Sequence, residues 1–403
     1  MSAAGPLSGV RVIDVTTVFM GPSATQMLGD LGADVIKVEA PGGDSTRRIG
    51  PCGDQGMGPL YLGLNRNKRS IVLDLKQADG RAALLELVKD ADVLAYNVRP
   101  AAMQRLGLGY EELAALNPRL IYVGMFGFSQ RGRYAPDPAF DDLIQAACAL
   151  PVAMAAGSGD IPRYMPLTIA DRSVGLYAFG VIAAALYAQA RSGKGQRIDV
   201  PMFETMVPYV MGDHLYGETY VPAKGGFGYP RLMSPERRPY RTRDGHICLL
   251  LYSDEQWRVF WDRFGRPDVL TRDPRFRDIG TRSRHVNELY AEVAAVLVDY
   301  TIDEIRSRLS GSDFTLFPVL DIDGLAADPH LRATGFVHEI EHPTEGRLVQ
   351  TGVPSEWSDT PPSLRRPAPR LGEHTREVLR EAGMVDATID ALIETGAATQ
   401  SAT

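Results

Sequence analysis

The sequence is poor in cysteine, and the cysteines it has form no recognisable framework. Cys52, Cys148 and Cys248 are the only ones among 403 residues, and they lie far apart along the chain. An odd number of widely separated cysteines fits neither a disulfide scaffold nor the paired spacing of a zinc site. We therefore expect reduced thiols in a cytoplasmic protein, with no bound metal ion.

An excess of positive charge is also missing. The chain carries 43 Lys and Arg residues against 50 Asp and Glu residues, which gives a formal net charge of −7 at pH 7. Binding to nucleic acid requires a positively charged face that neutralises phosphates. Nucleic acid is therefore not an expected partner, and an anionic ligand would have to bind at a local cluster of basic residues.

Hydrophobic runs of the length that a membrane requires are lacking too. The N-terminal residues MSAAGPLSGV have neither the basic start nor the continuous apolar core of a secretory signal. Residues 174–190 form the most apolar stretch, which is a little shorter than the ~20 apolar residues needed to cross a bilayer. We interpret this stretch as a buried helix and expect no association with a membrane.

Short apolar runs alternate with helical patterns through the first part of the chain. Strand-like runs occupy residues 10–15, 34–39, 70–75, 92–96 and 120–126, and helical stretches follow Gly21 and cover residues 80–89. This alternation is typical of parallel strands joined by crossover helices. It predicts an α/β fold with a Rossmann-like, doubly wound parallel sheet.

The glycine fingerprint of dinucleotide-binding sheets is missing from the first turn between strand and helix. Residues 16–21 read TTVFMG, which supplies one glycine where three would let the backbone approach a pyrophosphate. Glu39 lies where a ribose-binding acid would fall, but it is more simply interpreted as a strand-end or salt-bridging residue. We therefore expect no nicotinamide or flavin cofactor.

A change in composition marks the start of a second domain. Residues 216–244 are rich in Gly, Pro and Arg, which is typical of an irregular connection. Beyond it, residues 246–251 resemble a strand, and residues 255–264, 286–300 and 303–309 follow a helical pattern. These elements predict a smaller α+β domain at residues 216–330. Two more helices are expected near residues 373–381 and 387–393.

Asp171 stands immediately before the long apolar stretch, in the segment PLTIADRSVGLYAFG. Aspartate is a favoured N-cap, so one interpretation is a purely structural helix cap. The dipole of the helix would also hold a carboxylate there in its ionised form, and an ionised carboxylate can attack a carbonyl carbon. Composition alone leaves both roles open.

Five separated segments, at residues 7–44, 65–76, 97–113, 193–204 and 371–379, occur in the order found in a known family. They read LSGVRVIDVTTVFMGPSATQMLGDLGADVIKVEAPGGD, NRNKRSIVLDLK, NVRPAAMQRLGLGYEEL, GKGQRIDVPMFE and LGEHTREVL. They resemble the class III CoA-transferases, the family of formyl-CoA transferase, carnitine CoA-transferase and α-methylacyl-CoA racemase. The resemblance extends over nearly the whole chain.

The resemblance implies a covalent mechanism. In this family a catalytic aspartate precedes the long central helix, and Asp171 matches it. Its carboxylate would attack an acyl-CoA to form a mixed anhydride and then an aspartyl-CoA thioester, which an acceptor carboxylic acid would open. Coenzyme A is the expected carrier. The resemblance also implies an interlocked homodimer. In each chain, residues 1–215 and 331–403 would build the large domain, and the residues between them the small one.

Several basic and polar residues lie near the ends of the predicted strands, where this architecture binds ligands. The resemblance associates one group with coenzyme A, namely Lys68, Arg69, Asn97, Arg99 and Arg105. For Arg47 and Arg48, a solvated surface position is an equally good interpretation.

Phe140 separates the two chemistries of the family. The racemase branch carries a histidine in a segment like GHDINY, and the corresponding residues here are 139–142, AFDD, with Phe140 in place of the histidine. Phenylalanine cannot transfer a proton. A transferase is therefore expected, and a racemase-type isomerase or a non-catalytic acyl-CoA binding protein are the alternatives.

Other departures from the family concern the substrate. Phe19 and Ala40 replace the glutamine and the arginine of formyl-CoA transferases, which makes a formyl or oxalyl substrate doubtful. Gly225 and Gly226 partly match a mobile glycine loop of those enzymes, and Arg231 follows. A guanidinium group there could hold a second carboxylate, so succinyl-CoA is a candidate donor.

Overall fold

The computed structural model describes residues 5–52 and 56–401. They form two compact units. Unit 1 contains the described residues up to Ala147, together with Pro166–Met206 and those from Pro329 onward, and unit 2 contains Cys148–Met165 and Val207–Asp328. The helix α9 (Met202–His214) spans the boundary between them.

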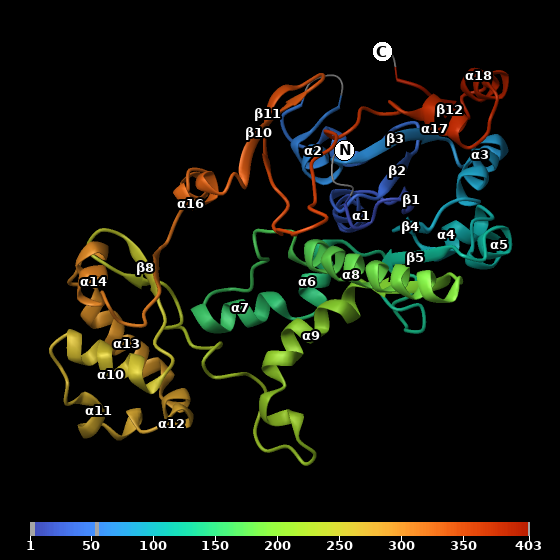
Figure 1. Cartoon of the computed structure of the whole chain (residues 1–403). Coiled ribbons are helices and arrows are strands. Elements are labelled where there is room, and N and C mark those ends of the chain that lie inside the picture. The colour runs from blue at the N-terminus through green and yellow to red at the C-terminus, as the bar shows by residue number, and fades with distance from the viewer. Residues whose placement is uncertain (1–4, 53–55, 402–403) are drawn as a thin grey trace. The chain divides into compact units, whose positions relative to one another are not determined.

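Unit 1 is built on a seven-stranded sheet in the order β12-β3-β2-β1-β4-β5-β6 (Figure 1). Its strands are β1 (Arg11–Val15), β2 (Asp34–Glu39), β3 (Lys68–Leu73), β4 (Val93–Tyr96), β5 (Ile121–Phe126), β6 (Gln196–Pro201) and β12 (Ala398–Thr399). All neighbours pair in parallel except β12, which runs antiparallel to β3. The order reverses between β1 and β4, and ligands of such sheets bind at this switch point, beyond the carboxyl ends of the strands.

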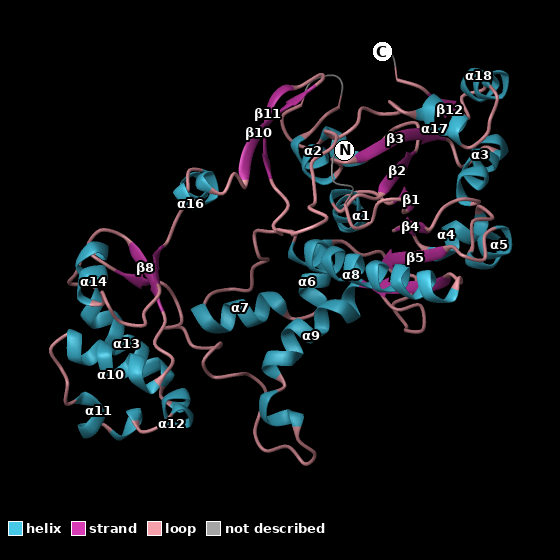
Figure 2. Ribbon diagram, viewed as in Figure 1, coloured by secondary structure: helices cyan, strands magenta, loops and turns pink. Residues whose placement is uncertain are grey.

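Helices cover both faces of the sheet, as Figure 2 shows. One face packs into a core with α3, α5, α17 and α18, through residues such as Leu84, Leu113 and Leu379. The other face carries α1 and α8, which also pack against each other. The helical segments of this unit are α1 (Met20–Asp30), η1 (Ser45–Arg48), α2 (Pro59–Leu64), α3 (Ala78–Val88), α4 (Pro100–Arg105), α5 (Tyr110–Leu116), α6 (Asp141–Ala147), α8 (Ile169–Ser192), α16 (Pro329–Ala333), α17 (Thr375–Glu381) and α18 (Asp386–Glu394).

Unit 2 combines a small antiparallel sheet with helices. Its strands are β7 (Tyr240–Arg241), β8 (His246–Leu249) and β9 (Leu316–Pro318), and its core gathers around Trp257, Phe260 and Trp261 of α10. A capping box between Ser253 and Gln256 begins that helix. The helical segments are α7 (Leu150–Ser158), η2 (Tyr216–Thr219), α10 (Asp254–Arg263), α11 (Val269–Arg272), η3 (Pro274–Phe276), α12 (Ile279–Arg284), α13 (Val286–Leu297), α14 (Ile302–Arg308) and α15 (Ile322–Ala326).

The predicted fold class is confirmed, and the five predicted strands match β1 to β5 within about two residues. The sequence patterns did not predict β6, β12 or the hairpin of β10 (Val337–His342) and β11 (Gly346–Thr351). Along β6 only Val200 is buried, so this edge strand lacks the apolar run that identified the others.

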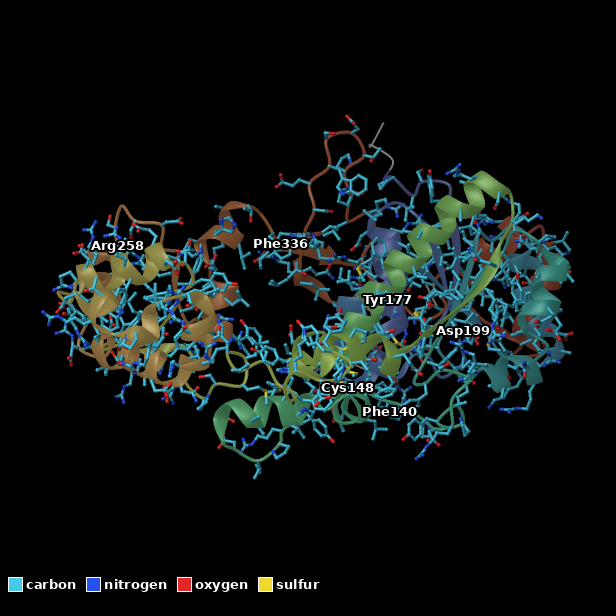
Figure 3. The ribbon with its side chains drawn as sticks, turned by 90° about the horizontal axis from the view of Figure 1, so that it is seen from below. Phe140, Cys148, Tyr177, Asp199, Arg258 and Phe336 are labelled. Carbon is cyan, nitrogen blue, oxygen red and sulfur yellow. The ribbon has the colours of Figure 1, made fainter. Side chains whose placement is uncertain are left out.

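The long helix α8 is only partly the buried helix that we predicted. By length and composition it is the one helix among the described residues that could cross a membrane. However, it packs against α1 and β5, and its Gln189 side chain donates a 2.6 Å hydrogen bond to the backbone oxygen of Arg119. The opposite face exposes Leu176, Tyr177 and Tyr187. Tyr177 is labelled in Figure 3. One face of α8 is thus core, and the other is an apolar surface.

Candidate active site

A cavity of about 420 Å³ lies at the carboxyl ends of the strands in unit 1. It includes residues that follow β1 and β4, the two strands on either side of the switch point, and others from the end of β5 and the start of α9. The cavity lining includes Thr17, Val18, Phe19, Met20, Asn97, Arg99, Phe126, Phe128, Phe140, Asp171 and Met202. The fold therefore places Asp171 where this architecture binds ligands.

Asp171 is the third residue of α8 rather than its N-cap, which is Thr168. The interpretation of Asp171 as the helix cap was therefore wrong by three positions. Its backbone N–H donates a 2.9 Å hydrogen bond to Oδ1 of Asp141, the first residue of α6. Asp141 thus accepts a hydrogen bond from a free backbone N–H in the first turn of α8, which is the capping role that the sequence alone suggested for Asp171.

The electrostatic surroundings of Asp171 oppose the expectation that the helix dipole holds it ionised. Burial raises the pKa of Asp171, the nearby carboxylate of Asp141 raises it further, and Arg172 lowers it by a smaller amount; the result is a pKa of about 7. The raised pKa makes the ionised carboxylate more basic than an ordinary aspartate, and basicity supports nucleophilic attack.

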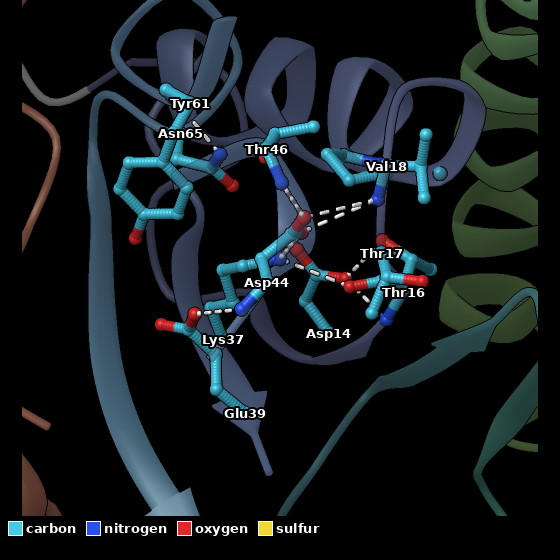
Figure 4. Close-up of polar contacts among 12 residues, drawn as sticks. Asp14, Thr16, Thr17, Val18, Lys37, Glu39, Asp44, Thr46, Tyr61 and Asn65 are labelled. Carbon is cyan, nitrogen blue, oxygen red and sulfur yellow. Dashed lines mark hydrogen bonds and ion pairs between the residues drawn. The ribbon is translucent and has the colours of Figure 1, made fainter. Parts of the chain in front are cut away.

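The loop from β1 to α1, which forms one wall of the cavity, is held by hydrogen bonds from several elements. Asn97 accepts the backbone N–H of Thr17 at 2.9 Å and donates its own amide to the Thr17 oxygen at 2.7 Å. Val18 has φ of +70°, a conformation that β-branched residues rarely adopt. Its N–H lies 3.3 Å from both carboxylate oxygens of Asp44 (Figure 4).

Buried charges lie beneath this loop. Lys37 donates to Asp44 at 3.0 Å and to the Thr16 oxygen at 2.9 Å, and the side chains of Lys37 and Asp44 are fully buried. Burial alone would raise the pKa of Asp14, but Lys68 and Lys37 outweigh it and lower the pKa to about 2. The site-forming loop therefore rests on a network of fully buried charges.

The family model described as CoA-transferase family III matches residues 7–375. This chain belongs to that family. Several relatives that match nearly its whole length are named CoA-transferases, and the chain is accordingly a class III CoA-transferase.

Individual relatives resemble this CoA-transferase along most of its length. The acetyl-CoA:oxalate CoA-transferase of Acetobacter aceti is 35% identical, with 94% of this chain and 96% of the relative covered. The succinate–glutarate CoA-transferase of Agrobacterium fabrum is 34% identical, with 95% and 97% covered. Among solved structures, a CAIB/BAIF family protein from Brucella suis has a TM-score of 0.77 at 28% identity, with 94% of this chain and 100% of that chain covered.

The structure separates the predicted coenzyme A ligands of the transferase into two sets. Asn97 and Arg99 line the cavity, and Arg105 is exposed at the end of α4, which begins directly after Arg99. Lys68 and Arg69 instead begin β3, at the amino end of a parallel strand, whereas the cavity lies at the carboxyl ends.

Lys68 and Arg69 make contacts of a structural kind. The fully buried Lys68 ammonium donates to Asp14, to Asn65, to Thr25 and to the backbone oxygen of Pro22, at 2.8 to 3.0 Å. Arg69 forms ion pairs with three carboxylates, of Asp34, Glu377 and Glu381. Binding of coenzyme A by these two residues stays a prediction, and their contacts favour a role in holding the sheet together.

Of the arginine pair in η1, Arg47 is not a solvated residue. Its guanidinium is buried, with Nη2 2.6 Å from Oε1 of Glu39 and 2.5 Å from the Tyr61 hydroxyl. Arg48 is exposed. Glu39 is thereby confirmed as a salt-bridging residue at the end of its strand.

Both predicted aromatic residues of the substrate pocket line the cavity with Asp171. Phe19 is the N-cap of α1, and the Arg172 guanidinium lies 5.9 Å from the centre of its ring. Phe140, which is labelled in Figure 3, directly precedes α6. It lines the cavity and is 67% exposed, so a ligand can reach its ring. Sequence reasoning missed Phe128, Met202 and Asp141. The apolar pair gave no local signal, but Asp141 stood beside Phe140 in the segment that distinguishes the family's branches.

The predicted glycine loop belongs to unit 2, whereas the cavity is lined by unit 1. Gly225 lies so close to Gly217 that a Cβ on Gly217 would be 2.5 Å from the Gly225 Cα. The backbone N–H of Gly217 also donates to the Gly226 oxygen at 3.2 Å. Arg231 donates through Nε to the Tyr290 hydroxyl at 3.0 Å. Their role toward substrate stays a prediction.

Proposed function

We propose that this enzyme moves coenzyme A from an acyl-CoA to a carboxylic acid through covalent intermediates on Asp171. The observation that supports this most directly is the position of Asp171. Its carboxylate borders the cavity at the switch point of the sheet, and its pKa is raised to about 7 by burial and by Asp141. A basic carboxylate in a ligand-binding cavity is suited to nucleophilic catalysis.

The proposed reaction proceeds by four exchanges at carbonyl carbons. A carboxylate oxygen of Asp171 attacks the thioester carbon, the C–S bond breaks, and coenzyme A leaves as its thiolate, with a mixed anhydride on the enzyme. The thiolate then attacks the aspartyl carbonyl, which releases the donor acid and forms an aspartyl-CoA thioester. The acceptor carboxylate attacks this thioester, again giving an anhydride and free thiolate. Attack of the thiolate on the acceptor acyl carbon restores Asp171 and releases the new acyl-CoA.

The energy of the thioester is kept throughout, because each step exchanges one activated acyl group for another. Water must therefore be kept from the anhydride and from the aspartyl thioester. The apolar side chains of Phe19, Phe128, Phe140 and Met202 around the cavity support this requirement. Asn97 and Arg99 at the same cavity are the proposed polar contacts to coenzyme A, with Arg105 further along the adjoining helix.

Succinyl-CoA is the first donor to test. The relative from Agrobacterium fabrum is named for succinate and glutarate. Phe19 stands where the resemblance to formyl-CoA transferases predicts a glutamine, and it lines the cavity. A guanidinium group can bind the second carboxylate of a dicarboxylic acid, and Arg231 stays the residue predicted for that role.

A racemase-type isomerase is disfavoured by Phe140, because a phenyl ring at the cavity can neither accept nor donate the α-proton. Such an isomerase would introduce deuterium from D₂O at the α-carbon of an acyl-CoA without any acceptor acid. A transferase would leave the α-carbon unlabelled.

A homodimer in the cytoplasm is the proposed state of the enzyme. The outer face of α8 supports it, since Leu176, Tyr177 and Tyr187 are each more than half exposed, at 58%, 54% and 66%. Large apolar side chains that gather at the surface in this way are typical of a surface that pairs with another protein. Light scattering would measure the mass of the wild type and of Tyr177→Lys, which is expected to weaken the dimer.

Isotope exchange tests the proposed function without knowledge of the acceptor. The enzyme is incubated with succinyl-CoA and ¹⁴C-labelled succinate, and label is measured in the thioester. A transferase that uses this donor incorporates label, and Asp171→Asn does not. If coenzyme A binds but no acid from a panel of mono- and dicarboxylates exchanges into its own thioester, the protein is a binding protein and the proposal is wrong.

A further inference from the structure

Asp141 is a buried carboxylate placed against the proposed nucleophile. It begins α6, is only 7% exposed, and its Oδ1 accepts the backbone N–H of Asp171 at 2.9 Å. Its other oxygen, Oδ2, accepts the side-chain amide of Gln145, one turn along α6, at 2.6 Å. Both carboxylate oxygens therefore accept hydrogen bonds, which is the pattern that an ionised aspartate makes.

The charges around Asp171 come from few sources. The carboxylate of Asp141 belongs to α6, and the guanidinium of Arg172 to α8 itself. The first turn of α1, which packs against α8, reads Met20, Gly21, Pro22 and Ser23 and carries no titratable side chain. Arg99 and Asp137 line the cavity more widely. Asp141 is thus the negative charge that is both buried and hydrogen-bonded to the residue bearing the nucleophile.

We propose that Asp141 is a positioning residue whose negative charge favours the covalent states of the enzyme, an inference that rests on Asp171 being the nucleophile. In the resting enzyme, the negative charge of Asp141, whose Oδ1 is hydrogen-bonded to the backbone N–H of Asp171, repels the ionised Asp171 carboxylate in a partly buried site. When Asp171 becomes an anhydride or an aspartyl-CoA thioester, its side chain is neutral and the repulsion is gone. Asp141 itself forms and breaks no bond and exchanges no proton.

Two effects follow from this arrangement. The repulsion raises the free energy of the enzyme with a free Asp171 carboxylate relative to the acylated enzyme. The equilibrium between free enzyme with acyl-CoA and the aspartyl-CoA thioester therefore shifts toward the thioester. The hydrogen bond from Asp171 to Asp141 also fixes the first turn of α8 against α6, the two helices being in contact. Charge and position can be separated, because asparagine keeps the acceptor oxygen and removes the charge.

The test compares Asp141→Asn with Asp142→Asn, a control one residue along the same helix at an exposed position. Each purified enzyme is equilibrated with succinyl-CoA and succinate at a fixed ratio, or with the donor pair that proves active. The fraction present as aspartyl-CoA thioester is measured by intact-mass spectrometry. The rate of thioester formation in a single turnover is then recorded against pH.

For Asp141→Asn we expect the ratio of aspartyl-CoA thioester to free enzyme at equilibrium to be about tenfold lower than in the wild type. We also expect the acid limb of the pH profile, the range in which the rate rises with pH, to lie at lower pH than in the wild type. Asp142→Asn should change neither quantity. A role in structure alone would slow the reaction without moving the acid limb. If Asp141→Asn does not fold, Asp141→Ser supplies a neutral acceptor of smaller size.

The inference is overturned if the wild type forms the adduct on Asp171 while the neutral variants leave both the equilibrium fraction and the acid limb unchanged. That outcome leaves the proposed mechanism intact. If the wild type transfers coenzyme A but forms no adduct on Asp171, the mechanism itself is wrong, and the inference falls with it.

Discussion

Lys37 and Asp44 form a fully buried ion pair, with Nζ and Oδ2 3.0 Å apart, directly beneath the loop that leads from β1 into α1. Lys37 also donates to the Thr16 oxygen, and Asp44 accepts the N–H of Val18, whose backbone has a positive φ. Strain of this kind costs of order 1–3 kcal/mol and persists only where the surroundings impose it. The ion pair therefore helps to hold the cavity wall in its observed shape, together with the hydrogen bonds of Asn97 to Thr17.

Removing one member of this pair should harm both stability and substrate binding. Asp44→Asn removes the carboxylate to which the buried Lys37 ammonium donates, and breaking a buried ion pair costs about 3–5 kcal/mol in comparable cases. We expect a lower free energy of unfolding in urea and a raised KM for the acyl-CoA. The contradicting result would be wild-type values of both for Asp44→Asn.

A glycine fixes the distance between the two helices that border the active site. A Cβ at Gly175, one turn beyond Asp171 in α8, would lie 2.7 Å from the backbone oxygen of Met20 and 2.2 Å from Oγ of Ser23. The serine can rotate, but the backbone oxygen cannot. Gly175→Ala should therefore push α8 away from α1, destabilise the fold by about 1–3 kcal/mol and reduce kcat roughly tenfold or more.

Gly180 of the same helix is the matched control for this substitution. Apart from Gly180, its two neighbours in the chain and the nearby backbone of its own helix, no heavy atom of the described residues lies within 4 Å of a Cβ built at Gly180. Alanine is the better helix former, so Gly180→Ala should keep activity and add up to about 1 kcal/mol of stability. Equal losses in both variants would mean that crowding against α1 is not the cause.

The pH dependence of the reaction should report the titration of Asp171. Burial and the charge of Asp141 raise the pKa of this carboxyl to about 7, and attack requires the ionised form. We expect kcat/KM for the acyl-CoA to rise with pH through the region near 7 and to reach a plateau above it. A profile that is flat from pH 5 to pH 9 would contradict this account.

Because of the same raised pKa, ionised Asp171 lowers the free energy of unfolding at high pH. Its pKa is 3.8 in the absence of the fold and about 7 within it, so the folded state binds the proton more tightly. Stability therefore falls as the pH rises from about 4 to 7, on the order of 2–4 kcal/mol in total.

Asp171→Asn removes this effect. The variant should unfold at a higher temperature than the wild type at pH 8, and the difference should shrink toward pH 4. Asp142→Asn, at an exposed position, is the control and should follow the wild type at both pH values. A variant that is less stable than the wild type at pH 8 would show that the raised pKa is not correct.

The sheet could be predicted from sequence because its strands are local features. Each of β1 to β5 is a short, mostly buried apolar run. The buried network carried a signal as well, since the charged Lys37 in the middle of the apolar strand DVIKVE must be paired if it is buried. β12 contains two residues and is defined by its pairing with β3, more than 300 residues away, so no local pattern marks it.

The active site was only partly predictable. Asp171 was recognised through family segments, but its raised pKa depends on its burial and on Asp141, which the packing of α6 on α8 brings to it from 30 residues away. Likewise, Lys68 was predicted to bind coenzyme A because it lies in a family segment and near a strand end. Only the fold shows that the Lys68 ammonium forms a buried ion pair with Asp14.

The most direct test is the mass of the peptide that contains Asp171, after the enzyme has been incubated with succinyl-CoA, or with whichever acyl-CoA it turns over, and digested. The account predicts a coenzyme A adduct on Asp171 in the wild type, and neither adduct nor turnover in Asp171→Asn, with the variant still folded. Turnover without any adduct on this peptide, together with full activity of Asp171→Asn, would contradict it.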